Sequence, residues 1–176
     1  MNLFGTQPRA LALAGVFLGA LAGPTAFAAP ADVALLNEYI GTWKGSSQIT
    51  RPGGEPETVV CRMTFADGTG DKINFNGRCS LAGNQMSVSG TIAYVEAKNR
   101  YEAAMSSNVQ FTGLAIGVRK GNSIVFDLQE KNKDEEGKPL EITSKIVLAN
   151  DKIGVDFKVV FVESGDSLSA SIPFTK

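Results

Sequence analysis

Apolar and polar residues alternate with a period of two through most of the chain after residue 42, and this limits the fold more than any other feature. Successive side chains of a β-strand point to opposite faces, so the pattern predicts strands with one buried face. Glycine, proline, asparagine and aspartate cluster between the alternating stretches, where they favour tight turns. The predicted strands cover residues 43–50, 58–65, 74–81, 86–95, 100–107, 111–119, 123–130, 140–148, 153–163 and 168–174.

Short strands joined by tight turns favour an antiparallel meander. Closing a meander into a barrel removes its edge strands, whose unpaired backbone groups invite aggregation. We therefore predict an all-β fold, an antiparallel up-and-down β-barrel of about 8–10 strands. Two packed antiparallel sheets are the alternative that the pattern leaves open.

A short N-terminal helix is expected before the first strand, over residues 31–40. Leu36 and Tyr39 belong to an apolar stripe with helical spacing. Asp32 is placed to cap the first turn of this helix, and Gly41 is placed to end it.

Residues 1–28 have the three parts of a secretory signal peptide. Arg9 supplies the positive charge, an apolar run covers residues 10–22, and Ala26-Phe27-Ala28 fits the small-x-small cleavage pattern. The apolar run is too short to span a bilayer, which takes roughly 20 residues. We expect residues 29–176 to form one domain in the periplasm or outside the cell, with no membrane span after cleavage.

The charge balance and the absence of histidine exclude several classes of function. The sequence has 17 Lys and Arg, 18 Asp and Glu, and no His. This balance argues against a nucleic-acid-binding protein. Without histidine there is no Ser-His-Asp or Cys-His nucleophile, no His-ligated zinc and no haem held by a proximal His. The acidic loops 67–71 and 131–138 lack the spacing of a calcium site, so we expect no metal. No serine lies in a Gly-x-Ser-x-Gly elbow and no Gly-rich loop precedes a helix, so we also expect no cofactor and no enzymatic activity.

The two cysteines flank a turn near Gly70. If the flanking strands pair so that partner numbers sum to 140, Cys61 faces Cys79 and Phe65 faces Phe75. This register places the apolar and Cys residues on one side, and a slip of one residue would destroy the sorting. Directly opposed side chains come within disulfide reach, so we predict a Cys61–Cys79 disulfide with a structural role.

Arg62 faces Arg78 on the other side of the same hairpin, and like charges directly opposite each other are destabilising. One interpretation is that both side chains extend into water or meet acids on neighbouring strands. The other is that they form a site for an anion or a partner protein.

The segment Tyr39-Ile40-Gly41-Thr42-Trp43-Lys44-Gly45 resembles the calycin group, which includes lipocalins and fatty-acid-binding proteins. The likeness consists of a short helix, Gly-x-Trp on the first strand and a run of antiparallel strands. It implies barrel closure by Trp43, packed against a basic residue of a late strand, for which Lys176 is the candidate. The order of Trp43, Cys61 and Cys79 is also similar to that of small exported inhibitors of bacterial metalloproteases.

A barrel of this size either encloses a ligand cavity or is filled by its own side chains. Small residues in the middle strands would leave space if they point inward: Ala103, Ala104, Ser106, Ser107, Gly113, Ala115 and Gly117. Alternatively, they permit strand bending or fit around larger neighbours. The predicted ligand-binding residues are Phe65, Phe75, Met105, Phe111, Phe126 and Phe157, and Met86, Val88 and Phe161 are further candidates for the lining.

These observations predict an exported, non-catalytic β-barrel that binds a small hydrophobic ligand. The alternative is a protein-binding module, such as a periplasmic protease inhibitor or an envelope interaction protein. A hollow interior would favour the first function, whereas a filled core with an exposed patch would favour the second.

Overall fold

The computed structural model describes residues 29–50, 53–81, 84–108, 111–134 and 136–176. The predicted signal segment 1–28 lies outside the described residues. No helix in the described part of the chain has the length and apolarity to cross a membrane.

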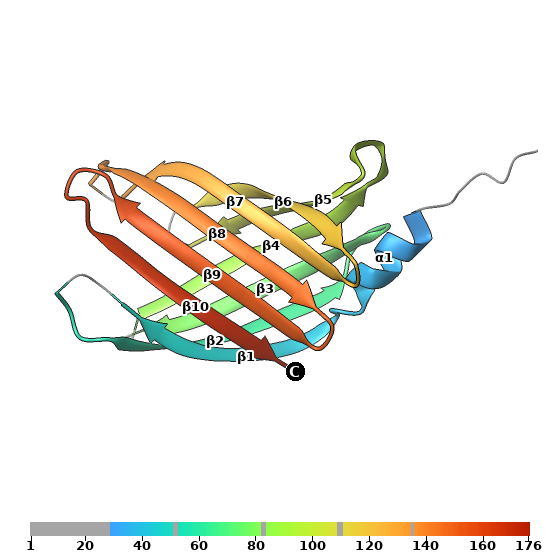
Figure 1. Cartoon of the computed structure of the whole chain (residues 1–176), viewed down its shortest axis with the longest axis horizontal. Helices are drawn as coiled ribbons and strands as arrows, with labels where there is room; N and C mark the ends of the chain where they lie inside the picture. Colours follow the sequence, from blue (N-terminus) through green and yellow to red (C-terminus); the bar gives the residue numbers. More distant parts are fainter. Residues whose placement is uncertain (1–28, 51–52, 82–83, 109–110, 135) are drawn as a thin grey trace, which may run out of the picture.

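Ten antiparallel strands follow one another around a closed barrel (Figure 1). Each strand pairs with its neighbours in the sequence, and β10 returns to pair with β1. The predicted up-and-down barrel is therefore confirmed, and the two-sheet alternative is wrong. The strands are β1 (Gly41–Ile49), β2 (Glu57–Asp67), β3 (Lys72–Leu81), β4 (Asn84–Val95), β5 (Arg100–Ser107), β6 (Thr112–Lys120), β7 (Ser123–Lys133), β8 (Pro139–Ala149), β9 (Lys152–Phe161) and β10 (Ser167–Thr175).

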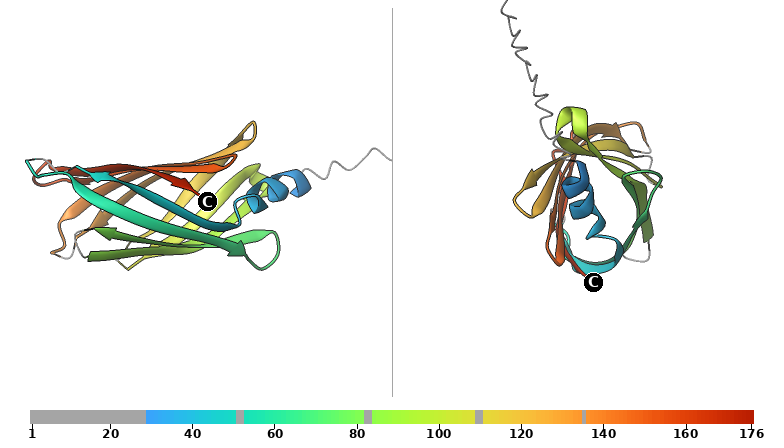
Figure 2. Two further views of the ribbon diagram at one scale, coloured as in Figure 1. Left: turned by 90° about the horizontal axis from the view of Figure 1, so that it is seen from below. Right: turned by 90° about the vertical axis from the view of Figure 1, so that its right-hand side faces the viewer.

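A single α-helix of the described chain, α1 (Ala29–Asn37), lies across one end of the barrel, as the end-on view in Figure 2 shows. We call this the helix end, and we call the opposite end, where β1 ends and β2 begins, the mouth. Leu35 and Leu36 of α1 are buried together with Tyr39. The helix therefore closes its end of the barrel with apolar side chains. A short 3-10 helix, η1 (Glu96–Lys98), connects β4 to β5 at the same end.

The helix differs from the prediction at both ends. Asp32 lies inside the first turn, and its carboxylate bonds to strand residues instead of capping the helix. The helix ends at Asn37, before Gly41, because a tight turn leads from it into β1. Gly41 is instead the first residue of that strand, with a φ of 136° that favours glycine.

Asp32 ties α1 to the barrel wall. The Tyr101 hydroxyl on β5 donates hydrogen bonds to the carboxylate Oδ1 and to the backbone oxygen of Asp32, each at 3.1 Å. Arg119 on β6 donates to the same Oδ1, also at 3.1 Å. Burial, followed by the nearby carboxylate of Asp32, raises the pKa of Tyr101 well above its usual value, so its hydroxyl keeps its proton at neutral pH.

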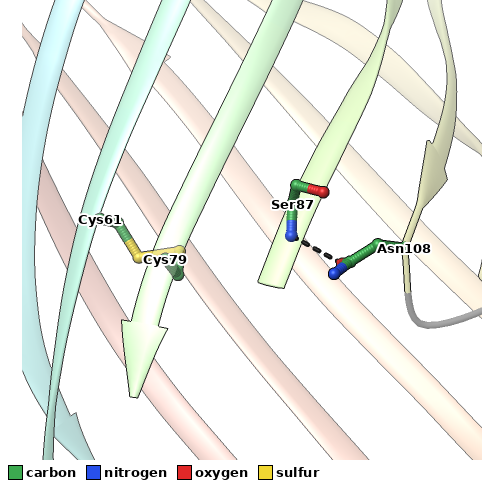
Figure 3. Close-up of a disulfide and its surroundings, with 4 residues drawn as sticks. All are labelled: Cys61, Cys79, Ser87 and Asn108. Atoms are coloured by element: carbon green, nitrogen blue, oxygen red, sulfur yellow. Dashed lines mark hydrogen bonds between the residues drawn. A yellow bond between two sulfur atoms is a disulfide. The ribbon is translucent and has the colours of Figure 1, made fainter. Parts of the chain in front are cut away.

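The β2–β3 hairpin has the predicted register, with Phe65 opposite Phe75 and Arg62 opposite Arg78. Cys61 faces Cys79, and their sulfur atoms are bonded at 2.01 Å (Figure 3). The disulfide prediction is thus confirmed, and the bond links two strands whose pairing the alternation already specifies.

Replacing Tyr101 by Phe should lower the free energy of unfolding by about 1–3 kcal/mol, because the buried carboxylate of Asp32 loses a donor. The matched control is the same Tyr101→Phe substitution in an Asp32→Ala background, where the hydroxyl has no carboxylate to bond. We expect the control to change stability by less than about 0.5 kcal/mol. Urea denaturation measures the free energy of unfolding of both variants, and equal losses would show that the hydrogen bond to Asp32 adds no stability.

Candidate functional site

The barrel encloses an apolar cavity of about 240 Å³. All six predicted ligand-binding residues line it, and so do Met86 and Val88. Phe161, the remaining candidate, does not line the cavity: it is the last residue of β9, beyond the mouth, and is 38% exposed. The lining consists of Met63, Phe65, Phe75, Met86, Val88, Ile92, Ala103, Met105, Ser107, Phe111, Phe126, Leu128, Ile142, Ser144, Ile146, Leu148, Val155, Phe157 and Val159.

The cavity wall contains no ionisable side chain among the described residues, and its polar side chains are those of Ser107 and Ser144. The Ser144 hydroxyl donates to the backbone oxygen of Asp156 at 3.0 Å, so its proton is directed into the sheet. Such a wall offers dispersion contacts and removal of apolar surface from water, with almost no polar recognition. Three methionines add adaptable contacts, because their unbranched side chains can change rotamer around a guest.

Glycines beside the aromatic residues explain how the cavity stays open. Phe75 lies opposite Gly90, and Phe126 lies opposite Gly117. An added Cβ at Gly90 would approach the Phe75 ring to 2.7 Å, and one at Gly117 would approach the Phe126 ring to 2.5 Å. Each ring therefore lies over its glycine, in space that a side chain would otherwise fill. The rings cover the wall and leave the centre of the barrel empty.

The other small residues of the middle strands divide between the two faces of the sheet. Ala103 and Ser107 line the cavity, whereas Ala104 and Ser106 are exposed on the outside. Gly113 gives room to Phe111, whose ring would be 2.7 Å from an added Cβ. Both readings of these small residues are therefore correct in part: some leave space, and others fit around larger neighbours.

The sequence interpretation missed the contribution of β8 to the cavity. Ile142, Ser144 and Ile146 alternate along this strand and all face inward. Extending the period-two pattern across β8 would have identified them, because the strand was predicted almost at its observed bounds.

The cavity has a floor toward the helix end and opens toward the mouth. Phe65, Phe126 and Leu148 belong to the floor, because they lie near the strand ends that α1 covers. Met86 lies near the opposite end of β4, and Phe111 directly precedes β6 at that same end. The cavity therefore extends from the packed helix end toward the mouth.

Trp43 lies below the floor and is fully buried. Its indole Nε1 donates to the backbone oxygen of Tyr39 at 2.9 Å. The Lys176 ammonium lies 5.0 Å from the centroid of the Trp43 ring and donates to the backbone oxygen of Glu38 at 3.1 Å. The structure thus contains the contact that the calycin resemblance implies, and a cation over the indole face is favourable.

The described residues contain no group of three Cys, Asp or Glu side chains arranged to hold a metal ion. The acidic loop between β7 and β8 instead forms hydrogen bonds within itself. The Asp134 carboxylate accepts hydrogen bonds from the backbone of Glu136 at 2.9 Å and of Lys138 at 2.8 Å.

No protein-family model matches the sequence, and no curated protein is similar to it in sequence. The fold is similar to that in the crystal structure of Rv2717c from M. tuberculosis, with a TM-score of 0.59. The two sequences are 15% identical, and the match covers 82% of this chain and 97% of that chain. At this identity the likeness establishes a shared barrel fold alone.

Gly117→Ala should destabilise the protein by about 1–3 kcal/mol, because the new methyl group would displace the Phe126 ring. Gly154→Ala is the matched control, since an added Cβ there meets nothing within 4 Å. We expect the control to stay within about 0.5 kcal/mol of the unmodified protein. Urea unfolding measures both changes, and an unaffected Gly117→Ala variant would refute the role given to this glycine.

Proposed function

We propose that this protein is an exported, non-catalytic carrier that binds a small uncharged hydrophobic molecule inside the barrel. The observation that carries the proposal is the apolar cavity, which all six predicted contact residues line. A closed apolar cavity of roughly 150 Å³ in another protein stays dry and binds benzene. The cavity of about 240 Å³ is larger, so it suits a ligand of one or two rings or a short chain.

The lining favours a ligand without charge. Among the residues that the structure describes, no Lys or Arg lines the cavity to meet a buried carboxylate. Burying an unpaired charge costs several kcal/mol or more, whereas each buried CH₂ group contributes roughly 0.8 kcal/mol of favourable free energy. An ionised fatty acid would have to keep its head group outside the mouth, while a neutral molecule can enter completely.

Three further parts of the proposal rest on indirect support. Membership of the calycin group is supported by the Gly41-x-Trp43 segment and by the position of Lys176 over the indole. Export is supported by the signal-like residues 1–28 and by the disulfide, because disulfides persist in oxidising compartments. A binding role in place of catalysis follows from a wall without ionisable groups to transfer protons or attack a substrate.

A protein-binding module remains the second candidate because of one feature of the outer surface. Leu114 and Val118 on β6 are 46% and 42% exposed, and Ile116 lies between them on the same outer face. Alternating apolar residues on the outside of a strand can mark a contact surface. The hollow interior favours the carrier, so we rank the protein-binding function second.

Fluorescence titration tests the carrier function with two probes that share one ring skeleton. Naphthalene is uncharged, and naphthalene-2-sulfonate carries an added negative charge; both have two rings and fluoresce. We expect the uncharged probe to bind the full chain more tightly, because the cavity cannot pair the sulfonate.

Ala103→Leu fills part of the cavity and should weaken binding of the uncharged probe at least tenfold, about 1.4 kcal/mol. Ala104→Leu is the matched control, because the neighbouring side chain is exposed on the outer face. Circular dichroism confirms that both variants fold, and Val155→Phe replaces Ala103→Leu if the latter does not. Failure of the protein to bind the uncharged probe, or equal binding by both variants, would overturn the proposal.

A further inference from the structure

Three cationic side chains form a row on the outer face of the barrel. Lys44 on β1 lies directly opposite Arg62 on β2, which lies directly opposite Arg78 on β3. All three are exposed. Neighbouring strands are about 4.8 Å apart, so the row spans roughly 10 Å across the sheet. We call these residues the cationic row.

No acid compensates the row. Within the described residues, none of the three cations forms an ion pair or a side-chain hydrogen bond. The outward side chains beside Arg62 and Arg78 on their own strands are neutral: Val60, Thr64, Asn76 and Ser80. Ser87, opposite Arg78 on β4, is neutral too. Like charges directly opposite each other destabilise a sheet, so the arrangement lowers the stability of the fold, and no contact of the described residues offsets this loss.

Another part of the barrel shows that the same sheet accommodates charge differently where compensation is available. Asp127 on β7 lies opposite Lys145 on β8, which lies opposite Asp156 on β9. That row alternates negative, positive and negative. The cationic row has the same geometry, but all three of its side chains are positive. This pattern is expected of a site whose compensating negative charge comes from a bound ligand.

The disulfide holds the row together. Arg62 follows Cys61 and Arg78 precedes Cys79, so the covalent link lies one residue from the repelling pair. The bond prevents the two strands from separating under the repulsion between the guanidinium groups. The backbone positions that carry the two arginines are therefore fixed relative to each other, which reduces the entropic cost of binding an anion.

The surface beside the row is hollowed. Lys44, Arg62 and Arg78 line this hollow together with Ser80 and Gln85. Guanidinium groups present forked N–H donors that match the oxygens of phosphate, and a hydroxyl and an amide add neutral hydrogen bonds. We propose that the cationic row is a binding site for a ligand that carries phosphate groups with at least two negative charges. This site lies outside the cavity and does not depend on the proposed carrier function.

Pyrophosphate titration at constant ionic strength tests the site, with NaCl as the ionic-strength control. We expect pyrophosphate to raise the melting temperature of the protein more than NaCl does, because binding to the folded state adds to simple screening. In the variant Arg62→Gln/Arg78→Gln, calorimetry should show pyrophosphate binding weakened at least tenfold. Lys120→Gln/Lys158→Gln removes the same charge from other exposed strand positions and should bind pyrophosphate like the unmodified protein.

Sedimentation with phosphatidylglycerol vesicles, compared with phosphatidylcholine vesicles, distinguishes a lipid headgroup from a soluble phosphate ligand. Vesicle binding that is lost in the arginine variant assigns the site to a lipid surface, and pyrophosphate binding alone assigns it to a soluble ligand. Without phosphate and at low salt, the arginine variant should melt no lower than the unmodified protein, because a repulsion has been removed. Equal effects of NaCl and pyrophosphate together with no vesicle binding, or equal loss of binding in both double variants, would overturn the proposal.

Discussion

Closure of the sheet between β1 and β10 is the constraint on which the rest of the structure depends. The two strands pair at Lys44–Thr175 and Gly45–Phe174, and they meet again at the bridge between Thr50 and Ser169. Between these places Pro173 has no N–H to donate, so few hydrogen bonds join β1 to β10. Gly45 is essential to it, because an added Cβ would lie 2.5 Å from the Pro173 backbone oxygen. Without this close approach the barrel would have two open edges and no enclosed interior.

A closed barrel of ten strands has more interior than its aromatic residues fill. The helix end is packed solid by α1, Tyr39, Trp43 and Tyr101, and the Asp32 contacts hold the helix in place. Further along the axis, Phe75 and Phe126 lie against glycines of neighbouring strands and leave the centre empty. One set of residues therefore packs the helix end, and another leaves the centre of the barrel empty. This division lets the cavity remain hollow without loss of a packed core.

The sequence predicted much of the fold because its strongest signals are local. The alternation identified all ten strands, and the β2–β3 register followed because one pairing alone sorts Cys61, Cys79 and the phenylalanines to a common face. The helix ends were wrong, since Asp32 bonds to β5 and β6, far away in the chain. The β8 contribution to the cavity was missed, although its alternation was readable. The contacts of Asp32 with β5 and β6 join residues that are far apart in the chain, so local periodicity does not indicate them.

By itself, the sequence determined the strands, their inward and outward faces and the disulfide, because period-two alternation and turn residues act between near neighbours. Only the tertiary structure decided that the barrel is hollow, because the volume left inside depends on how each ring settles against a glycine of the adjoining strand. It alone also placed Lys44 in line with Arg62 and Arg78, with no acid beside them in the described part of the chain, since that row crosses three strands joined by turns. Periodicity assigns a side chain to a face, while closure of the sheet decides which side chains share the space.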